Sequence, residues 1–122
     1  MKRTAIINDH FKPETLLTFV NGKEERMLLT LKALKEGLNQ DAAQIGKVLK
    51  EKDQTQLRSL AHKIKPNFFL LGMDEVGNLC KELESVNLDQ EGNEKVTILL
   101  DKIPNVIKEI DEFTIGHLYH EL

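Results

Sequence analysis

The chain has 122 residues, 40% of them hydrophobic and 30% charged, which is enough for one hydrophobic core and too apolar for a disordered segment. A formal charge of −3 and the absence of tryptophan disfavour a nucleic-acid-binding protein, which needs a basic face or stacking aromatics. No apolar run approaches the roughly 18 residues of a membrane span. Cys80 has no second cysteine to pair with, so nothing indicates an oxidising compartment and we expect a cytoplasmic location. The length predicts a single domain over residues 1–122.

Apolar residues recur at steps of three and four, which predicts helices. We expect a short helix near Pro13–Phe19 and a long one over Glu24–Lys52. Gly37 and Gly46 each cost the long helix roughly 1 kcal/mol relative to alanine, so a break near residues 38–41 is the alternative. The unbroken apolar stripe favours a single helix. Its members are Met27, Leu31, Leu34, Leu38, Ala42, Ile45 and Leu49.

Two further helices follow closely. Asp53 and Gln56 resemble a capping box, and the helix that they begin should end at Gly72. Asp74 and Glu75 suit the positive N-terminal end of the next helix. The two apolar stripes are Leu57, Ala61, Ile64, Phe68 and Leu71, and then Val76, Leu79, Cys80, Leu83 and Val86.

The last helix should follow a polar loop at Asn87–Asn93, and Pro104 should bend it. No segment indicates a strand. Four amphipathic helices with short connections predict an all-α fold, an antiparallel (up-down-up-down) four-helix bundle with an additional short N-terminal helix. The last apolar stripe is Val96, Leu99, Leu100, Ile103, Val106, Ile107, Ile110 and Phe113.

His62 is the residue that most clearly indicates chemistry. At 100° per residue it points about 140° away from the centre of its helix's apolar stripe, toward solvent. Neutral imidazole presents a nitrogen nucleophile that can accept a phosphoryl group. Lys65, one turn on, is the best candidate to stabilise the phosphate, with Arg58 and Lys63 as flanking charges. An exposed histidine on a solvated basic face is the alternative interpretation.

The same stretch resembles the signature of the histidine-containing phosphotransfer (HPt) family, Ala-His-x-Ile/Leu-Lys-Gly followed by a glycine ten residues after the histidine. Ala61, His62, Ile64, Lys65 and Gly72 match it in register. The later stretch Leu-Cys-Lys-Glu-Leu-Glu at residues 79–84 is similar to the family's Leu-Cys-x-x-Leu-Glu helix. The resemblance covers roughly residues 24–84.

The resemblance implies a phosphorelay carrier in two-component signalling. His62 would take a phosphoryl group from a receiver-domain aspartate and pass it to another receiver, in a response regulator or a hybrid histidine kinase. The receivers supply the aspartate and the metal. The chain has no phosphate-binding loop for ATP, so we expect a phosphotransfer intermediate rather than an autonomous kinase, without cofactor or metal and commonly monomeric.

Two residues depart from the family pattern. Pro66 stands where the family usually has glycine, and its missing N–H predicts a kink just after His62. Phe69 stands where the family usually has a small residue, on nearly the same face as His62. The ring either folds back against the next helix or forms an exposed apolar anchor for a partner, and we favour the anchor. Together with Gly72, these residues complete the predicted binding set.

Other interpretations remain. Pro66 and Phe69 are also compatible with a non-catalytic helical module that binds receivers without being phosphorylated. His117 and His120 could ligate a metal, but a polar chain end is the favoured explanation. Cys80 lies on an apolar stripe, which predicts a buried, inert thiol.

Overall fold

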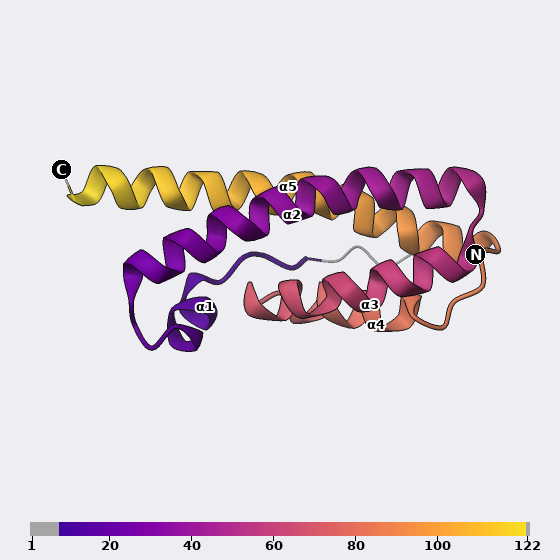
Figure 1. Cartoon of the computed structure of the whole chain (residues 1–122), viewed down its shortest axis with the longest axis horizontal. Coiled ribbons are helices and arrows are strands. Elements are labelled where there is room, and N and C mark those ends of the chain that lie inside the picture. Colours follow the sequence, from indigo (N-terminus) through magenta and orange to yellow (C-terminus); the bar gives the residue numbers. More distant parts are fainter. Residues whose placement is uncertain (1–7, 122) are drawn as a thin grey trace.

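The computed structural model describes residues 8–121, with side chains up to His117. It confirms the predicted all-α bundle with a short N-terminal helix, and the described residues contain no strand (Figure 1). The long second helix is unbroken, as its stripe predicted. The helices are α1 (Pro13–Phe19), α2 (Glu24–Glu51), α3 (Gln54–Leu70), α4 (Asp74–Leu83) and α5 (Gln90–Glu121).

The predicted loop at Asn87–Asn93 is wrong in its second half, because α5 already begins at Gln90. The carboxylate of Asp89 accepts a hydrogen bond from the backbone N–H of Gly92 at 2.9 Å, which satisfies an N–H that has no partner within the first helical turn. The Asp89 cap, rather than the first apolar residue, therefore determines where the helix begins.

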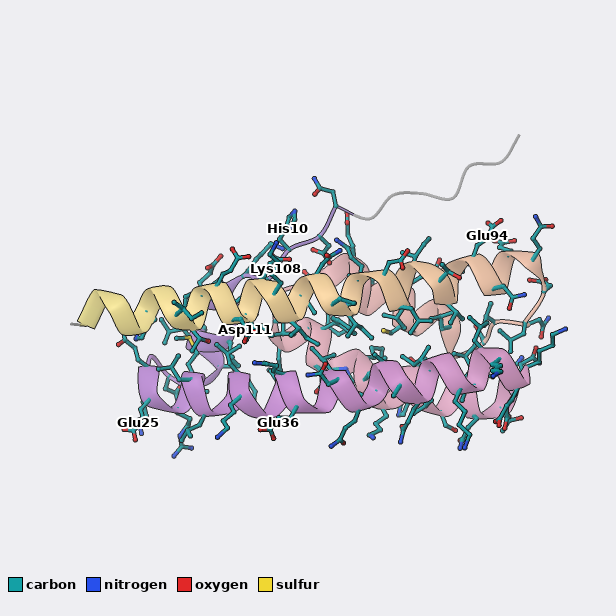
Figure 2. All side chains as sticks on the ribbon, turned by 90° about the horizontal axis from the view of Figure 1, so that it is seen from above. His10, Glu25, Glu36, Glu94, Lys108 and Asp111 are labelled. Atoms are coloured by element: carbon teal, nitrogen blue, oxygen red, sulfur yellow. The ribbon has the colours of Figure 1, made fainter. Side chains whose placement is uncertain are left out.

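The four long elements pack as a ring. Helix α3 packs against α2 and α4, and α5 packs against α2 and α4 on the other side. Very short connections make consecutive helices antiparallel, and α2 and α5 are also antiparallel: Lys35 meets Asp111 at 2.6 Å, while Glu24 lies near His117. Figure 2 shows Glu25 and Glu36 pointing outward from α2, whereas Asp111 lies between α2 and α5. Within the described part of the chain, no helix is long and apolar enough to span a membrane.

The core is built from the predicted stripes. Met27, Leu57, Phe68 and Val96 are all essentially inaccessible to solvent, as are most of their stripe partners. The burial of these apolar side chains supplies most of the stability of a small domain. Asp41 is the exception on α2, because it is buried in line with these apolar residues.

Local sequence signals form the α3–α4 hairpin. Asp53 caps α3 by accepting from the backbone N–H of Gln56 at 3.1 Å. At the other end, Gly72 adopts a positive φ of 72°, which costs a glycine little and lets the chain reverse. Helix α3 continues through Pro66, and α5 continues through Pro104. Pro66 has no N–H, so the His62 carbonyl lacks its usual helical donor.

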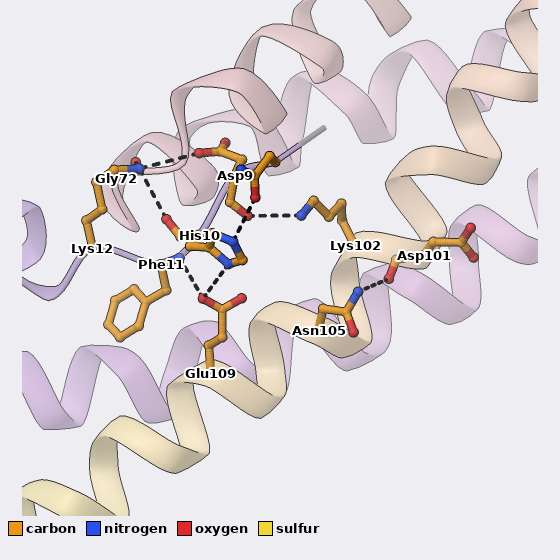
Figure 3. A network of polar contacts seen from close by, with 10 residues as sticks. Asp9, His10, Phe11, Lys12, Gly72, Asp101, Lys102, Asn105 and Glu109 are labelled. Carbon is orange, nitrogen blue, oxygen red and sulfur yellow. Dashed lines mark hydrogen bonds and ion pairs between the residues drawn. The ribbon is translucent and has the colours of Figure 1, made fainter. Parts of the chain in front are cut away.

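A segment that we call the N-terminal strap, Asp9–Lys12, lies across the α3–α4 turn (Figure 3). The buried Asp9 carboxylate accepts from the Val76 backbone N–H at 3.0 Å, near the start of α4. The ammonium of Lys12 donates to the Gly72 carbonyl at 2.8 Å. The strap thus satisfies polar groups at the turn that ends α3 and begins α4.

The same strap is held on its other side by α5. Glu109 accepts from the Phe11 backbone N–H at 3.1 Å and lies 3.3 Å from the His10 Nδ1 atom. The ammonium of Lys102 donates to the Asp9 carbonyl at 3.0 Å. The strap therefore connects α5 to the α3–α4 hairpin through contacts that span 60 residues or more of the sequence.

Candidate functional site

His62 stands on the outer face of α3, as the helical projection predicted. Its side chain is 73% exposed, while its neighbours Ala61 and Ile64 are buried in the core. The stripe fixes the rotation of the helix, and this rotation turns the imidazole toward solvent.

Glu84, at the end of α4, brings His62 and Lys65 together. One carboxylate oxygen lies 2.7 Å from His62 Nδ1, and the other accepts from the Lys65 ammonium at 2.5 Å. The hydrogen bond from Lys65, and to a smaller extent the one from His62, holds the pKa of the Glu84 carboxyl below its usual value. Glu84 is thus an ionised acceptor near neutral pH.

The ionised Glu84 determines which nitrogen of His62 can react. A carboxylate only accepts hydrogen bonds, so the neutral imidazole places its proton on Nδ1 and leaves a lone pair on Nε2. Within the described part of the chain, Nε2 makes no hydrogen bond. The arrangement presents a nucleophilic nitrogen to solvent, next to a cation one turn along the helix.

Sequence reasoning did not identify Glu84 as a site residue. It lies 22 residues from His62, and only the fold of the α3–α4 hairpin brings the two together. A signal was present, because Glu84 is the last residue of the Leu-Cys-x-x-Leu-Glu stretch. A glutamate that ends an amphipathic helix antiparallel to the His62 helix is a candidate to meet it.

The two predicted flanking cations are engaged elsewhere. Arg58 donates to the Val86 carbonyl at 3.0 and 3.1 Å and to Asn87, so its guanidinium holds the loop after α4. Lys63 pairs with Asp41 of α2 at 3.7 Å. Burial of Asp41 raises the pKa of its carboxyl, and Lys63 opposes this rise. Of the three predicted cations, Lys65 is the one that the structure brings to the carboxylate of Glu84.

Phe69 combines the two arrangements that the sequence left open. Its ring packs on Gly77 of α4, so closely that a methyl group built on Gly77 would lie 2.7 Å from the ring. The residue nevertheless remains 36% exposed. Pro66 is exposed between Phe69 and His62, whereas Gly72 is buried in the turn. Gly72 therefore shapes the hairpin rather than the surface around His62.

The remaining candidates from the sequence are Cys80 and the two histidines near the end of α5. Cys80 is buried, and burial raises the pKa of its thiol to about 12, so it is an unreactive core residue as predicted. His117 lies 3.4 Å from Glu24, and the side chain of His120 is outside the described residues. Among the described side chains, no group of three or more metal-binding residues gathers.

Comparison with known proteins identifies the family and the fold. The family model described as "Hpt domain" matches residues 30–113, a range that contains His62, Lys65 and Glu84. The crystal structure of the HPT domain from a Shewanella Hpt sensor hybrid histidine kinase has the same fold. It is 23% identical, with a TM-score of 0.77, over 87% of this chain and 94% of that one. Comparison with curated protein sequences gave no significant match. The chain belongs to the Hpt domain family.

Proposed function

We propose that the protein is a phosphorelay carrier that accepts a phosphoryl group on Nε2 of His62 and passes it on. The donor is the aspartyl phosphate of a receiver domain, and the acceptor is the aspartate of a second receiver. The observation that carries the proposal is the hydrogen bond between Glu84 and Nδ1, since it leaves the Nε2 lone pair available.

The transfer balances without further reactants. The Nε2 lone pair attacks phosphorus, the bond from phosphorus to the aspartate oxygen breaks, and the aspartate leaves as a carboxylate. The Nδ1 proton stays in place, so the phosphorylated ring is cationic and Glu84 stabilises that charge. Onward transfer reverses the sequence on a second aspartate.

Lys65 supplies positive charge to the transferring group. It is held by Glu84 at rest, one turn from His62 on the same side of α3. When a phosphoryl group is bound to Nε2, the flexible side chain of Lys65 can reach its negatively charged oxygens, while Glu84 keeps its contact with Nδ1. The metal and the carboxyl chemistry belong to the receiver, and the proposal requires no cofactor on this chain.

A transfer assay tests the proposal. Receiver domains from the genome that encodes this chain are phosphorylated with a labelled small phosphodonor, freed of donor and mixed with the protein. We expect an adduct that acid hydrolyses and base does not, complete loss of the adduct in His62→Gln, and retention in the matched control His10→Gln. An unlabelled wild type, or an undiminished adduct in His62→Gln, would overturn the assignment.

The alternative is a module that binds receivers without being phosphorylated. Phe69 supports it, because an ordered and partly exposed aromatic ring beside His62 suits docking whether or not transfer follows. This alternative predicts receiver binding that survives His62→Ala in a protein that never acquires the label.

A further inference from the structure

Phe69 lies close to His62 on the surface of one continuous helix. It is seven residues further along α3, which displaces it by about 10 Å along the axis and by about 20° around it. Pro66 is exposed between them. Beyond the imidazole, the outer face of α3 therefore carries two exposed apolar residues, Pro66 and Phe69, beside the Lys65 that is paired with Glu84.

The ring of Phe69 is held in place. Its atoms Cε1 and Cζ lie 2.7 Å from the position of a Cβ atom on Gly77, so only a glycine there allows the ring to approach α4 this closely. One side of the aromatic ring is thus packed, while the residue keeps 36% of its surface exposed. An apolar group that is already ordered loses little conformational entropy when a partner covers it.

The footprint of a partner on His62 must include this ring. A standard interface covers about 800 Å² on each protein, which corresponds to a circle of radius about 16 Å. Phe69 lies well within that radius of His62, and even a small transient interface extends over it. A receiver that brings its aspartate to Nε2 therefore covers Phe69 as well.

The cations around His62 offer little competing attraction. Arg58, Lys63 and Lys65 are bound to Val86, Asp41 and Glu84, respectively. The carboxylates of Asp41 and Glu84 offset much of the charge of Lys63 and Lys65, and a partner that pairs directly with any of the three cations must compete with a contact already made. The same partner can bury Phe69 without competing with a polar contact. The apolar contact is therefore the part of the surface that can distinguish one partner from another.

We infer that Phe69, held by Gly77, is the specificity-determining residue for the receiver domain that docks on His62. The inference rests on the proposed function. The receiver that fits has an uncharged apolar recess about 10 Å from its phosphorylated aspartate. Receivers with a bulky or charged group at that place are rejected by steric overlap or by burial of an unpaired charge.

The test compares variants against a panel of isolated receiver domains from the same genome. Phosphotransfer gives KM and kcat for each receiver, and calorimetric titration gives Kd independently of transfer. For the preferred receiver we expect Phe69→Ala to raise both KM and Kd at least tenfold, with kcat changed less than twofold. For disfavoured receivers the change should be smaller or opposite in sign. Ile115→Ala is the matched control, since Ile115 is 53% exposed on α5, which does not pack on α3, and it should change neither constant.

A double-mutant cycle tests the coupling between the two residues. Gly77→Ala must displace the ring, so it should raise KM in the wild-type background and have no further effect in the Phe69→Ala background. Circular dichroism establishes that each variant is folded, and Phe69→Leu, which leaves Gly77 untouched, should restore part of the affinity. Unchanged constants in Phe69→Ala, or an equal loss for every receiver, would overturn the inference. A wild type that binds receivers without accepting the label would refute the proposed relay alone, since Kd still tests Phe69. A wild type that binds no receiver refutes both.

Discussion

Among the side chains that the structure describes, two exposed histidines lie beside a glutamate, and they differ in what their second nitrogen contacts. His10 contacts Glu109 through Nδ1 and Asn8 through Nε2, so both nitrogens are engaged in the strap. His62 contacts Glu84 through Nδ1 alone. The glutamates differ as well, since Glu109 also accepts a backbone N–H, whereas Glu84 also holds the Lys65 ammonium. Exposure and a neighbouring carboxylate are common to both sites. The available nitrogen and the adjacent cation are what distinguish the proposed phosphoacceptor His62 from the structural contact of His10.

Alanine substitutions of the two glutamates should give the largest difference between the two histidine sites. Glu84→Ala removes the acceptor that keeps the proton on Nδ1, so we expect phosphotransfer to His62 to slow by about tenfold or more. Glu109→Ala removes strap contacts and should lower the free energy of unfolding while leaving the transfer rate unchanged. Rapid-mixing phosphotransfer and denaturant unfolding measure the two effects. Equal transfer rates in both variants would show that the two histidine–glutamate pairs do not differ in function.

Substitutions of two glycines test how closely the strap packs on the α3–α4 turn. Gly72→Ala places a Cβ atom 2.7 Å from Lys12 and Thr15 in a left-handed backbone conformation, so it should cost about 1–2 kcal/mol or more of stability. Gly46→Ala in α2 meets nothing within 4 Å and should stabilise the protein by roughly 0.5–1 kcal/mol. Urea unfolding measures both. A Gly72→Ala variant as stable as wild type would contradict close packing of the strap on the turn.

The smallest effect concerns two carboxylates whose pKa values shift in opposite directions. Burial raises the pKa of Asp41, so ionisation destabilises the folded state at neutral pH, whereas the pKa of Glu84 is lowered and its ionised form stabilises the folded state. We expect Asp41→Asn to be slightly more stable than wild type at pH 7. This advantage should disappear as the pH falls through the raised pKa of Asp41 toward its usual value near 3.8. Unfolding curves between pH 3 and 7 measure the difference, and an advantage that grows toward low pH would contradict the assigned direction.

Sequence periodicity predicted the helices well because each must bury one stripe, and steps of three and four reveal that stripe directly. It predicted that the His62 side chain is exposed for the same reason, since a residue opposite the stripe has to face solvent. The partners of His62 were less accessible to this reasoning. Arg58 is as close to His62 along the helix as its predicted role requires, yet the carbonyl of Val86, 28 residues away, binds its guanidinium.

The strap was not predicted at all. Asp9, Lys102 and Glu109 make long-range contacts that span between 67 and 99 residues of sequence, and no periodic pattern connects them. Asp41 was also missed, because a single polar residue beside an apolar stripe gives no sign of whether it is buried. Such contacts depend on how helices are placed in space, which short-range patterns do not record.

Pro66 has one more consequence, and it is a spectroscopic one. In a regular helix the carbonyl of His62 would accept from the amide four residues later, and here that residue has no N–H. The amide I vibration of this carbonyl should therefore differ from those of its helical neighbours. A single carbon-13 label at His62 would make the band visible by infrared difference spectroscopy, next to the ring whose charge changes in the proposed reaction. Pro66, one of the two departures from the family pattern, thus makes the His62 carbonyl a position where an isotope label can report on the site.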